Sequence, residues 1–195
     1  MKTETLLKKY VIVAAGSLLL GMGIGFADLA ALGTDPFTVF LTGTYRRVGV
    51  SLGTMNLIIN FMQIVMAFMV RRDAVSAATV IAMIGTSAGI DLPGLIGIPV
   101  LPLPAGALWL VSGLMLYSLG IALTQIPKCG YSPYDAYILS LIKLFPCEYH
   151  VMRWITDLIF VVTGWLLGGT VGIGTIVFLI FTGRLVEIIL DFLEK

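Results

Sequence analysis

The sequence predicts an all-α integral membrane protein, a single domain of residues 1–195 that crosses the bilayer six times. Three observations predict this class. Only 12% of the residues are charged and 58% are hydrophobic, whereas soluble domains carry about 25% charged residues. The mean hydropathy is +1.03. The apolar residues also form long runs, and about 17–25 residues are enough for a helix to span a bilayer.

Six apolar runs are long enough to span, and charges or clusters of Pro and Gly separate them. The first run is longer than the apolar part of a signal peptide, about 7–15 residues, so we expect a retained helix. The predicted spans are approximately Tyr10–Leu32, Leu52–Val70, Ala74–Ile90, Ala105–Ile126, Val151–Leu167 and Thr175–Phe192.

Two short helices are predicted between the spans. Each follows a Gly-x-x-Pro turn, Gly33 to Pro36 in one case and Gly130 to Pro133 in the other. Proline suits the first turn of a helix because the backbone N–H that it lacks would have no partner there. Helices of about 11 residues are too short to cross the bilayer, so we expect them to be interfacial or re-entrant.

The basic residues predict the orientation, because Lys and Arg gather on the cytoplasmic side. If the N-terminus is inside, nine basic residues are cytoplasmic and two, Arg46 and Arg47, are external, with Arg184 left unassigned. The nine are Lys2, Lys8, Lys9, Arg71, Arg72, Lys128, Lys143, Arg153 and Lys195. Both termini are therefore expected in the cytoplasm.

An internal repeat relates the two halves, residues 10–90 and about 105–192, at an offset of 97 residues. The offset aligns both Gly-x-x-Pro turns and also pairs polar residues inside the spans. Three spans per half is an odd number, so the halves must cross the membrane in opposite directions as an inverted repeat. The polar pairs are Asp28 with Gln125, Asn60 with Asp157, and Asn56 with Arg153.

The chain resembles the YczE/YyaS/YitT-like family of bacterial multi-pass membrane proteins. The resemblance rests on LGTDPF at 32–37, SLGT at 51–54, GYSPYD at 130–135 and LGGTVGIGT at 167–175. It implies a bacterial inner (plasma) membrane location and a membrane or transport role. It supplies no catalytic or binding residues.

Ionisable and amide side chains within spans are candidate binding residues, because they are costly in a bilayer. We expect Asp28 and Asp157 to form one central polar site with Gln125, Asn60 and Asn56. Two structural alternatives remain open. Asp28 is near enough to the interface to be hydrated or to cap a neighbouring helix, and Asp157 can pair with Arg153 one turn earlier.

The last span carries Arg184, Glu187 and Asp191 on one helical face. One interpretation is an internal gate in which Arg184 exchanges carboxylate partners with Glu187 and its neighbours. The alternative is a helix end stabilised by salt bridges, with side chains that reach the interface.

The leading functional hypothesis is a small secondary-transporter-like protein that moves a small solute or ion. Paired helix breaks in two halves are the sequence feature that points to such a site. The alternative is a non-transporting scaffold or accessory subunit that binds another membrane protein. Six spans enclose little volume, so a homodimer is also considered.

The composition argues against other classes. With 12 basic and 11 acidic residues the formal net charge is +1, so no nucleic-acid partner is expected. The two cysteines and one histidine show no spacing typical of a metal site or a catalytic nucleophile. We expect no enzyme activity, catalytic residues, metal or cofactor. A membrane enzyme ranks third, since Asp135 with His150 or Glu148 is the nearest approach to a catalytic set.

Cysteine labelling tests the orientation. After Cys129 and Cys147 are replaced by Ser, Arg72→Cys and Lys143→Cys should react with an impermeant maleimide only in permeabilised cells. Gly97→Cys should react in intact cells, because its loop is predicted to be external. Reversed or mixed accessibility would contradict the inverted-repeat topology.

Overall fold

The computed structural model describes residues 2–101 and 104–193, and its regular elements there are all helical. This confirms the predicted all-α class. The elements are α1 (Lys2–Ala30), α2 (Pro36–Val48), α3 (Leu52–Val70), the 3-10 helix η1 (Arg72–Ala74), α4 (Ala77–Leu95), α5 (Gly106–Gln125), α6 (Pro133–Leu144), α7 (Tyr149–Leu166) and α8 (Ile173–Leu193).

Five helices are long and apolar enough to cross a membrane: α1 from Thr5 onward, α3, α4, α5 and α8. This supports the membrane class. Helix α7 has 18 residues but is outside this set, because His150, Arg153 and Asp157 lower its hydropathy. The sixth span thus remains a prediction.

The third predicted span is shifted along the chain. It was expected over Ala74–Ile90, whereas α4 covers Ala77–Leu95. Ser76 explains the later start, because its side chain accepts a hydrogen bond from the Thr79 backbone N–H while Thr79 Oγ1 accepts one from the Ser76 N–H. This capping box satisfies two backbone donors that otherwise have no partner at a helix start.

Both predicted short helices are present and begin at their prolines. Asp35 is the N-cap of α2 and Ser132 is the N-cap of α6. Each cap side chain accepts a hydrogen bond from a backbone N–H three residues later, at 3.1 Å in both helices. Helix α2 ends where Gly49 takes up a left-handed conformation with φ +78°, which a residue without Cβ adopts readily.

Helix α1 is central in the packing and contacts α4 and α5 extensively. Its glycines permit the close approach to α5. A Cβ on Gly23 would come within 2.4 Å of the Tyr117 backbone nitrogen, and one on Gly16 would come within 3.1 Å of the Gly120 carbonyl oxygen. Small residues at such crossings let helix backbones approach in a membrane, where van der Waals packing replaces the hydrophobic effect.

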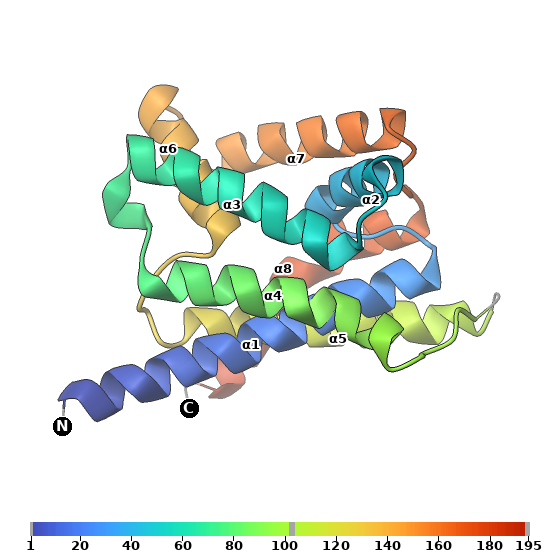
Figure 1. The fold of residues 1–195 in the computed structure, drawn as a ribbon, viewed down its shortest axis with the longest axis horizontal. Coiled ribbons are helices and arrows are strands. Elements are labelled where there is room, and N and C mark those ends of the chain that lie inside the picture. The colour runs from blue at the N-terminus through green and yellow to red at the C-terminus, as the bar shows by residue number, and fades with distance from the viewer. Residues whose placement is uncertain (1, 102–103, 194–195) are drawn as a thin grey trace.

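The two halves of the chain share one packed body. Helix α2 packs on α7, and α3 packs on α6, so each half inserts a short helix against a long helix of the other. Figure 1 shows α1, α3, α4 and α5 running along the longest dimension, with both chain ends at the same end of the bundle.

Substitution of Gly23 tests the crossing of α1 and α5. In Gly23→Ala the new methyl group would collide with backbone atoms, so we expect the free energy of unfolding to fall by about 1–3 kcal/mol. Gly94→Ala is the control, because nothing lies within 4 Å of a Cβ at that position. Thermal unfolding of purified protein measures both changes. Equal melting temperatures for the two variants would contradict the crossing.

Candidate functional site

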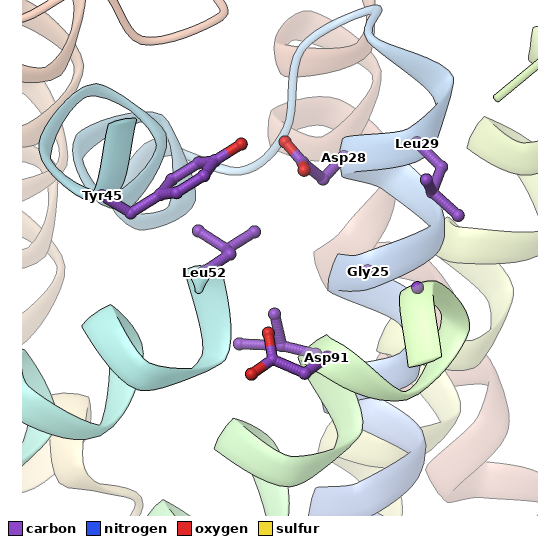
Figure 2. Close-up of a pocket in the computed structure, with 8 residues that line it drawn as sticks. Gly25, Asp28, Leu29, Tyr45, Leu52 and Asp91 are labelled. Atoms are coloured by element: carbon purple, nitrogen blue, oxygen red, sulfur yellow. The ribbon is translucent and has the colours of Figure 1, made fainter. Parts of the chain in front are cut away.

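A polar pocket of about 180 Å³ lies between α1, α2, α3 and α4. Figure 2 shows the Tyr45 phenol and the Asp28 carboxylate pointing into it from opposite sides, with Asp91 below them. Apolar side chains and two glycines form the rest of the wall. The lining residues are Gly25, Asp28, Leu29, Tyr45, Leu52, Ile90, Asp91 and Gly94.

Asp91 has a structural role at the edge of this pocket. Its carboxylate accepts hydrogen bonds from the Ser51 hydroxyl at 2.5 Å and from the Gly53 backbone N–H at 2.8 Å. Ser51 is also the N-cap of α3. Asp91 therefore joins the end of α4 to the start of α3, and its oxygens are already engaged by donors.

Asp28, unlike Asp91, has no hydrogen-bond donor among the described residues. It lies in the last turn of α1, one turn after Gly25. In the described part of the chain its carboxylate has no hydrogen bond or ion pair, although the charge of Arg46 acts on it from a distance. Gly25 allows α4 to approach, since a Cβ there would lie 2.5 Å from the Ile90 carbonyl oxygen.

A second polar cluster joins α6 and α7 around Arg153. The Tyr134 hydroxyl donates to Asp157 Oδ1 at 2.5 Å, and Arg153 Nε lies 4.0 Å from Asp157 Oδ2. Arg153 Nη1 donates to Asp135 Oδ1 at 3.2 Å, and Tyr149 donates to the same oxygen at 2.6 Å. Arg153 thus lies between two carboxylates, and both carboxylates have hydrogen-bond donors.

The Tyr134 phenol acts in this cluster as a neutral donor. Burial, followed by the negative charge of Asp157, raises the pKa of Tyr134 above its usual value. The proton therefore stays on the phenol and is available for the hydrogen bond to Asp157. The Arg153 guanidinium also lies 5.3 Å from the centre of the Tyr134 ring, within the range of a cation–π contact.

The starts of the two short helices meet at an aromatic contact. The Phe37 and Tyr134 rings stack at 5.6 Å, and Phe160 of α7 contacts both rings. The buried N-cap Asp35 accepts hydrogen bonds from both the backbone N–H and the hydroxyl of Thr38. Burial raises the pKa of the Asp35 carboxyl, although the hydrogen bonds from Thr38 act in the opposite direction.

The structure does not bring the predicted site residues together as one cluster. Asp28 lines the pocket, whereas Asp157 belongs to the cluster around Arg153. Asn56 donates to Ser87 at 2.9 Å between α3 and α4, and Asn60 is buried on the same helix. Gln125 is the last residue of α5. The binding roles of these residues remain predictions.

The ion pairs that the sequence offered as alternatives to functional roles are present in the structure. Arg153 and Asp157 form the expected pair one turn apart. Arg184 Nη1 lies 3.0 Å from Glu187 Oε2 on the exposed side of α8. His150 pairs with Glu148 at 3.2 Å on the surface, whereas Asp135 is bound to Tyr149 and Arg153. The gate role of Arg184 and Glu187 stays a prediction.

Several residues of the pocket and of the cluster around Arg153 were not predicted from the sequence. Tyr45, Asp91, Tyr134 and Tyr149 were assigned no role. One signal was available for Tyr134, because the 97-residue offset pairs it with Phe37. No sequence signal pointed to Asp91, whose partners precede it by 38 and 40 residues.

Removal of the Tyr134 hydroxyl tests the cluster around Arg153. Tyr134→Phe leaves a partly buried carboxylate without its donor, so the free energy of unfolding should fall by about 1–3 kcal/mol. Tyr137→Phe, on the same helix, is the control, because no hydrogen bond is found for its hydroxyl among the described residues. Chemical or thermal denaturation measures both variants. Equal stability of the two would show that the bond to Asp157 contributes nothing.

Comparisons with known proteins agree with the sequence resemblance. Over 191 residues the chain is 26% identical to "Uncharacterized protein YyaS" of Bacillus subtilis (strain 168), which covers 96% of this chain and 94% of that protein. An "Uncharacterized protein" of Haemophilus influenzae is 24% identical over 177 residues, or 91% of this chain and 81% of that protein. No solved structure matches the chain.

A family model described as "Family of unknown function (DUF6198)" matches residues 7–191. This match and the Bacillus relative confirm the predicted resemblance to YyaS-like proteins. With nearly its whole length covered, the chain belongs to the DUF6198 family.

Proposed function

We propose that the protein is a small secondary transporter of the bacterial inner membrane, and that its solute is a small cation or amine. The observation that carries this proposal is the pocket beside Asp28, where α1 ends and a short helix follows. Ionisable residues inside membrane segments are rare, and they mark solute and ion pathways.

The charge and size of the pocket select the solute class. Its wall carries the two carboxylates of Asp28 and Asp91 and the phenol of Tyr45. A pocket of about 180 Å³ is smaller than the roughly 300–1,000 Å³ of sites for drug-sized ligands, so it suits a small solute. Asp91 is occupied by two donors. Asp28 is therefore the carboxylate that remains to bind a positive group.

Three features support an inverted repeat. The helix N-caps Asp35 and Ser132 are 97 residues apart, as are Ser51 and Glu148. The packing of α2 on α7 has its counterpart in the packing of α6 on α3. A two-fold exchange of the halves maps each of these contacts onto the other. Transporters built in this way place solute sites between the repeats, near broken helices.

The glycines of α1 and α5 follow the same exchange. Gly16 packs against Gly120, and Gly23 packs against Gly113. The 97-residue offset converts the first contact into the second. We place the pseudo-two-fold axis between α1 and α5 for this reason.

The position of the termini supports α7 as the sixth crossing. Both chain ends lie at one end of the bundle in Figure 1, which requires an even number of crossings. The five apolar helices and α7 together give six. With Lys and Arg counted by the positive-inside rule, both termini are cytoplasmic and the Asp28 pocket opens near the external side.

The alternative role, a scaffold or accessory subunit, predicts polar residues that point outward to a partner. Most of the polar side chains inside the spans instead point inward. Asn56 and Gln63 of α3 are only 1% and 5% exposed, and Asp28 faces the pocket. The exposed pair of Arg184 and Glu187 is the observation that favours a partner. Transport therefore ranks first.

Ligand-dependent stabilisation tests the proposed solute class. Purified protein is melted with sodium, ammonium, ethylammonium or tetramethylammonium chloride at matched ionic strength. A cation at about 100 times its dissociation constant adds roughly 2.7 kcal/mol to the stability of the folded state. Asp28→Asn should abolish this stabilisation.

Asp73→Asn is the matched control, since its carboxylate is exposed and pairs with Arg71 far from the pocket. It should retain the full shift. If Asp28→Asn is stabilised as much as the unmodified protein, Asp28 is not the cation ligand. If no cation stabilises any form of the protein, the result favours the scaffold role over cation transport.

A further inference from the structure

The middle of α8 carries an ion pair on its exposed face. Arg184 is the twelfth of the 21 residues of Ile173–Leu193. Its guanidinium lies 3.0 Å from the Glu187 carboxylate, and the two side chains are 73% and 62% exposed. Helix α8 packs mainly on α5, through a buried face that includes Phe178.

Such a pair is costly if lipid surrounds it. Charged side chains at the centre of a membrane helix cost several kcal/mol and almost always face protein or a water-filled cavity. Glu187 is nine residues after Phe178, which places it on the opposite side of the helix from the packed face. No described helix covers that side, so a single copy leaves Arg184 exposed near the middle of α8 and Glu187 exposed one turn closer to the C-terminal end of the helix.

A second observation on the same face is Gly183. Nothing lies within 4 Å of a Cβ built on it, whereas every other glycine in the middle of a membrane helix packs against a neighbour. Glycine in a helix interior costs about 1 kcal/mol relative to alanine. Elsewhere in this fold the close approach of a second helix offsets that cost. Gly183 has no such neighbour within one chain.

We propose that a second copy of the chain packs on this face of α8 to form a homodimer. The interface, here called the α8 face, consists of Ile176, Ile180, Gly183, Arg184 and Glu187. The exposed side chains are Ile176 at 58%, Ile180 at 63% and the ion pair.

A second copy fits because the α8 face is complementary to itself in charge. It carries one cation and one anion, one helical turn apart. In a two-fold dimer the same patch is used twice, so residue i meets residue j and j meets i. Arg184 then lies near the partner's Glu187, and Glu187 lies near the partner's Arg184. Gly183 lets the two helices approach closely enough for both pairs to form.

The experiment is cysteine crosslinking in liposomes, with Cys129 and Cys147 first replaced by Ser. Ile180→Cys is compared with Phe61→Cys, an exposed position on α3 outside the α8 face. Under mild oxidation the yield of dimer should be at least about tenfold higher for Ile180→Cys, which corresponds to about 1.4 kcal/mol of preferred association. The yield should persist as lipid dilutes the protein.

Two second-site variants test the residues themselves. Gly183→Leu has open space around it in the single copy, so the melting temperature should be maintained while the Ile180→Cys crosslink falls to the Phe61→Cys level. The neutral double variant Arg184→Gln with Glu187→Gln should also lower the crosslink yield. The Asp28→Asn chain should dimerise normally, because this interface does not depend on transport.

Three results would overturn the dimer. They are equal yields at Ile180 and Phe61, a crosslink that disappears on dilution with lipid, and unchanged crosslinking in both the Gly183→Leu and the neutral double variants.

Discussion

The close approach of α1 to α4 and α5 is the interaction on which the rest of the fold depends. Inside a bilayer the hydrophobic effect does not drive helices together, so shape and backbone proximity must hold them. Gly16 and Gly23 of α1 meet α5, and Gly21 and Gly25 meet α4. Two faces of one helix are therefore fixed against two neighbours. The position of Asp28 follows from this, because it is one turn beyond Gly25.

The second constraint is the need to satisfy backbone donors wherever a helix starts inside the protein. Unpaired N–H groups have no water to bind in a bilayer. At the start of α2 the cap is Asp35 and the third residue is Thr38. At the start of α6 the order is reversed, with Ser132 as the cap and Asp135 in the third position. Both starts therefore place a hydroxyl against a carboxylate. Thr38 uses both oxygens of Asp35, whereas Ser132 uses only one oxygen of Asp135, and the other accepts a hydrogen bond from Arg153.

Features that depend on neighbours in sequence could be predicted, and features that depend on helix rotation could not. The Pro turns predicted both short helices, and the four-residue spacing of Arg153 and Asp157 gave their contact as one of two open alternatives, which the structure shows. The sequence could not show that Asp28 and Asp157 lie in two different polar sites. Periodicity indicates which residues share a helix face, but it does not indicate which helix packs against that face. The tight pairing of Asp91 with Ser51 also depends on α3 and α4 packing side by side.

Asp91 and Asp157 differ from Asp28 in their hydrogen bonding, and the proposed cation site rests on this difference. Asp91 and Asp157 each accept short hydrogen bonds, so removal of the donor would leave a poorly solvated charge and destabilise the fold. Asp28 accepts none from the described residues although it faces a pocket. A carboxylate without donors gains most from a cation, because binding supplies the interaction that the protein does not provide. The same argument applies to glycine. Gly23 packs closely against the backbone of α5, whereas no atom lies within 4 Å of a Cβ placed on Gly183. Asp28 and Gly183 therefore both lack the contact that their counterparts make, and at both positions the fold has room to bind a further partner.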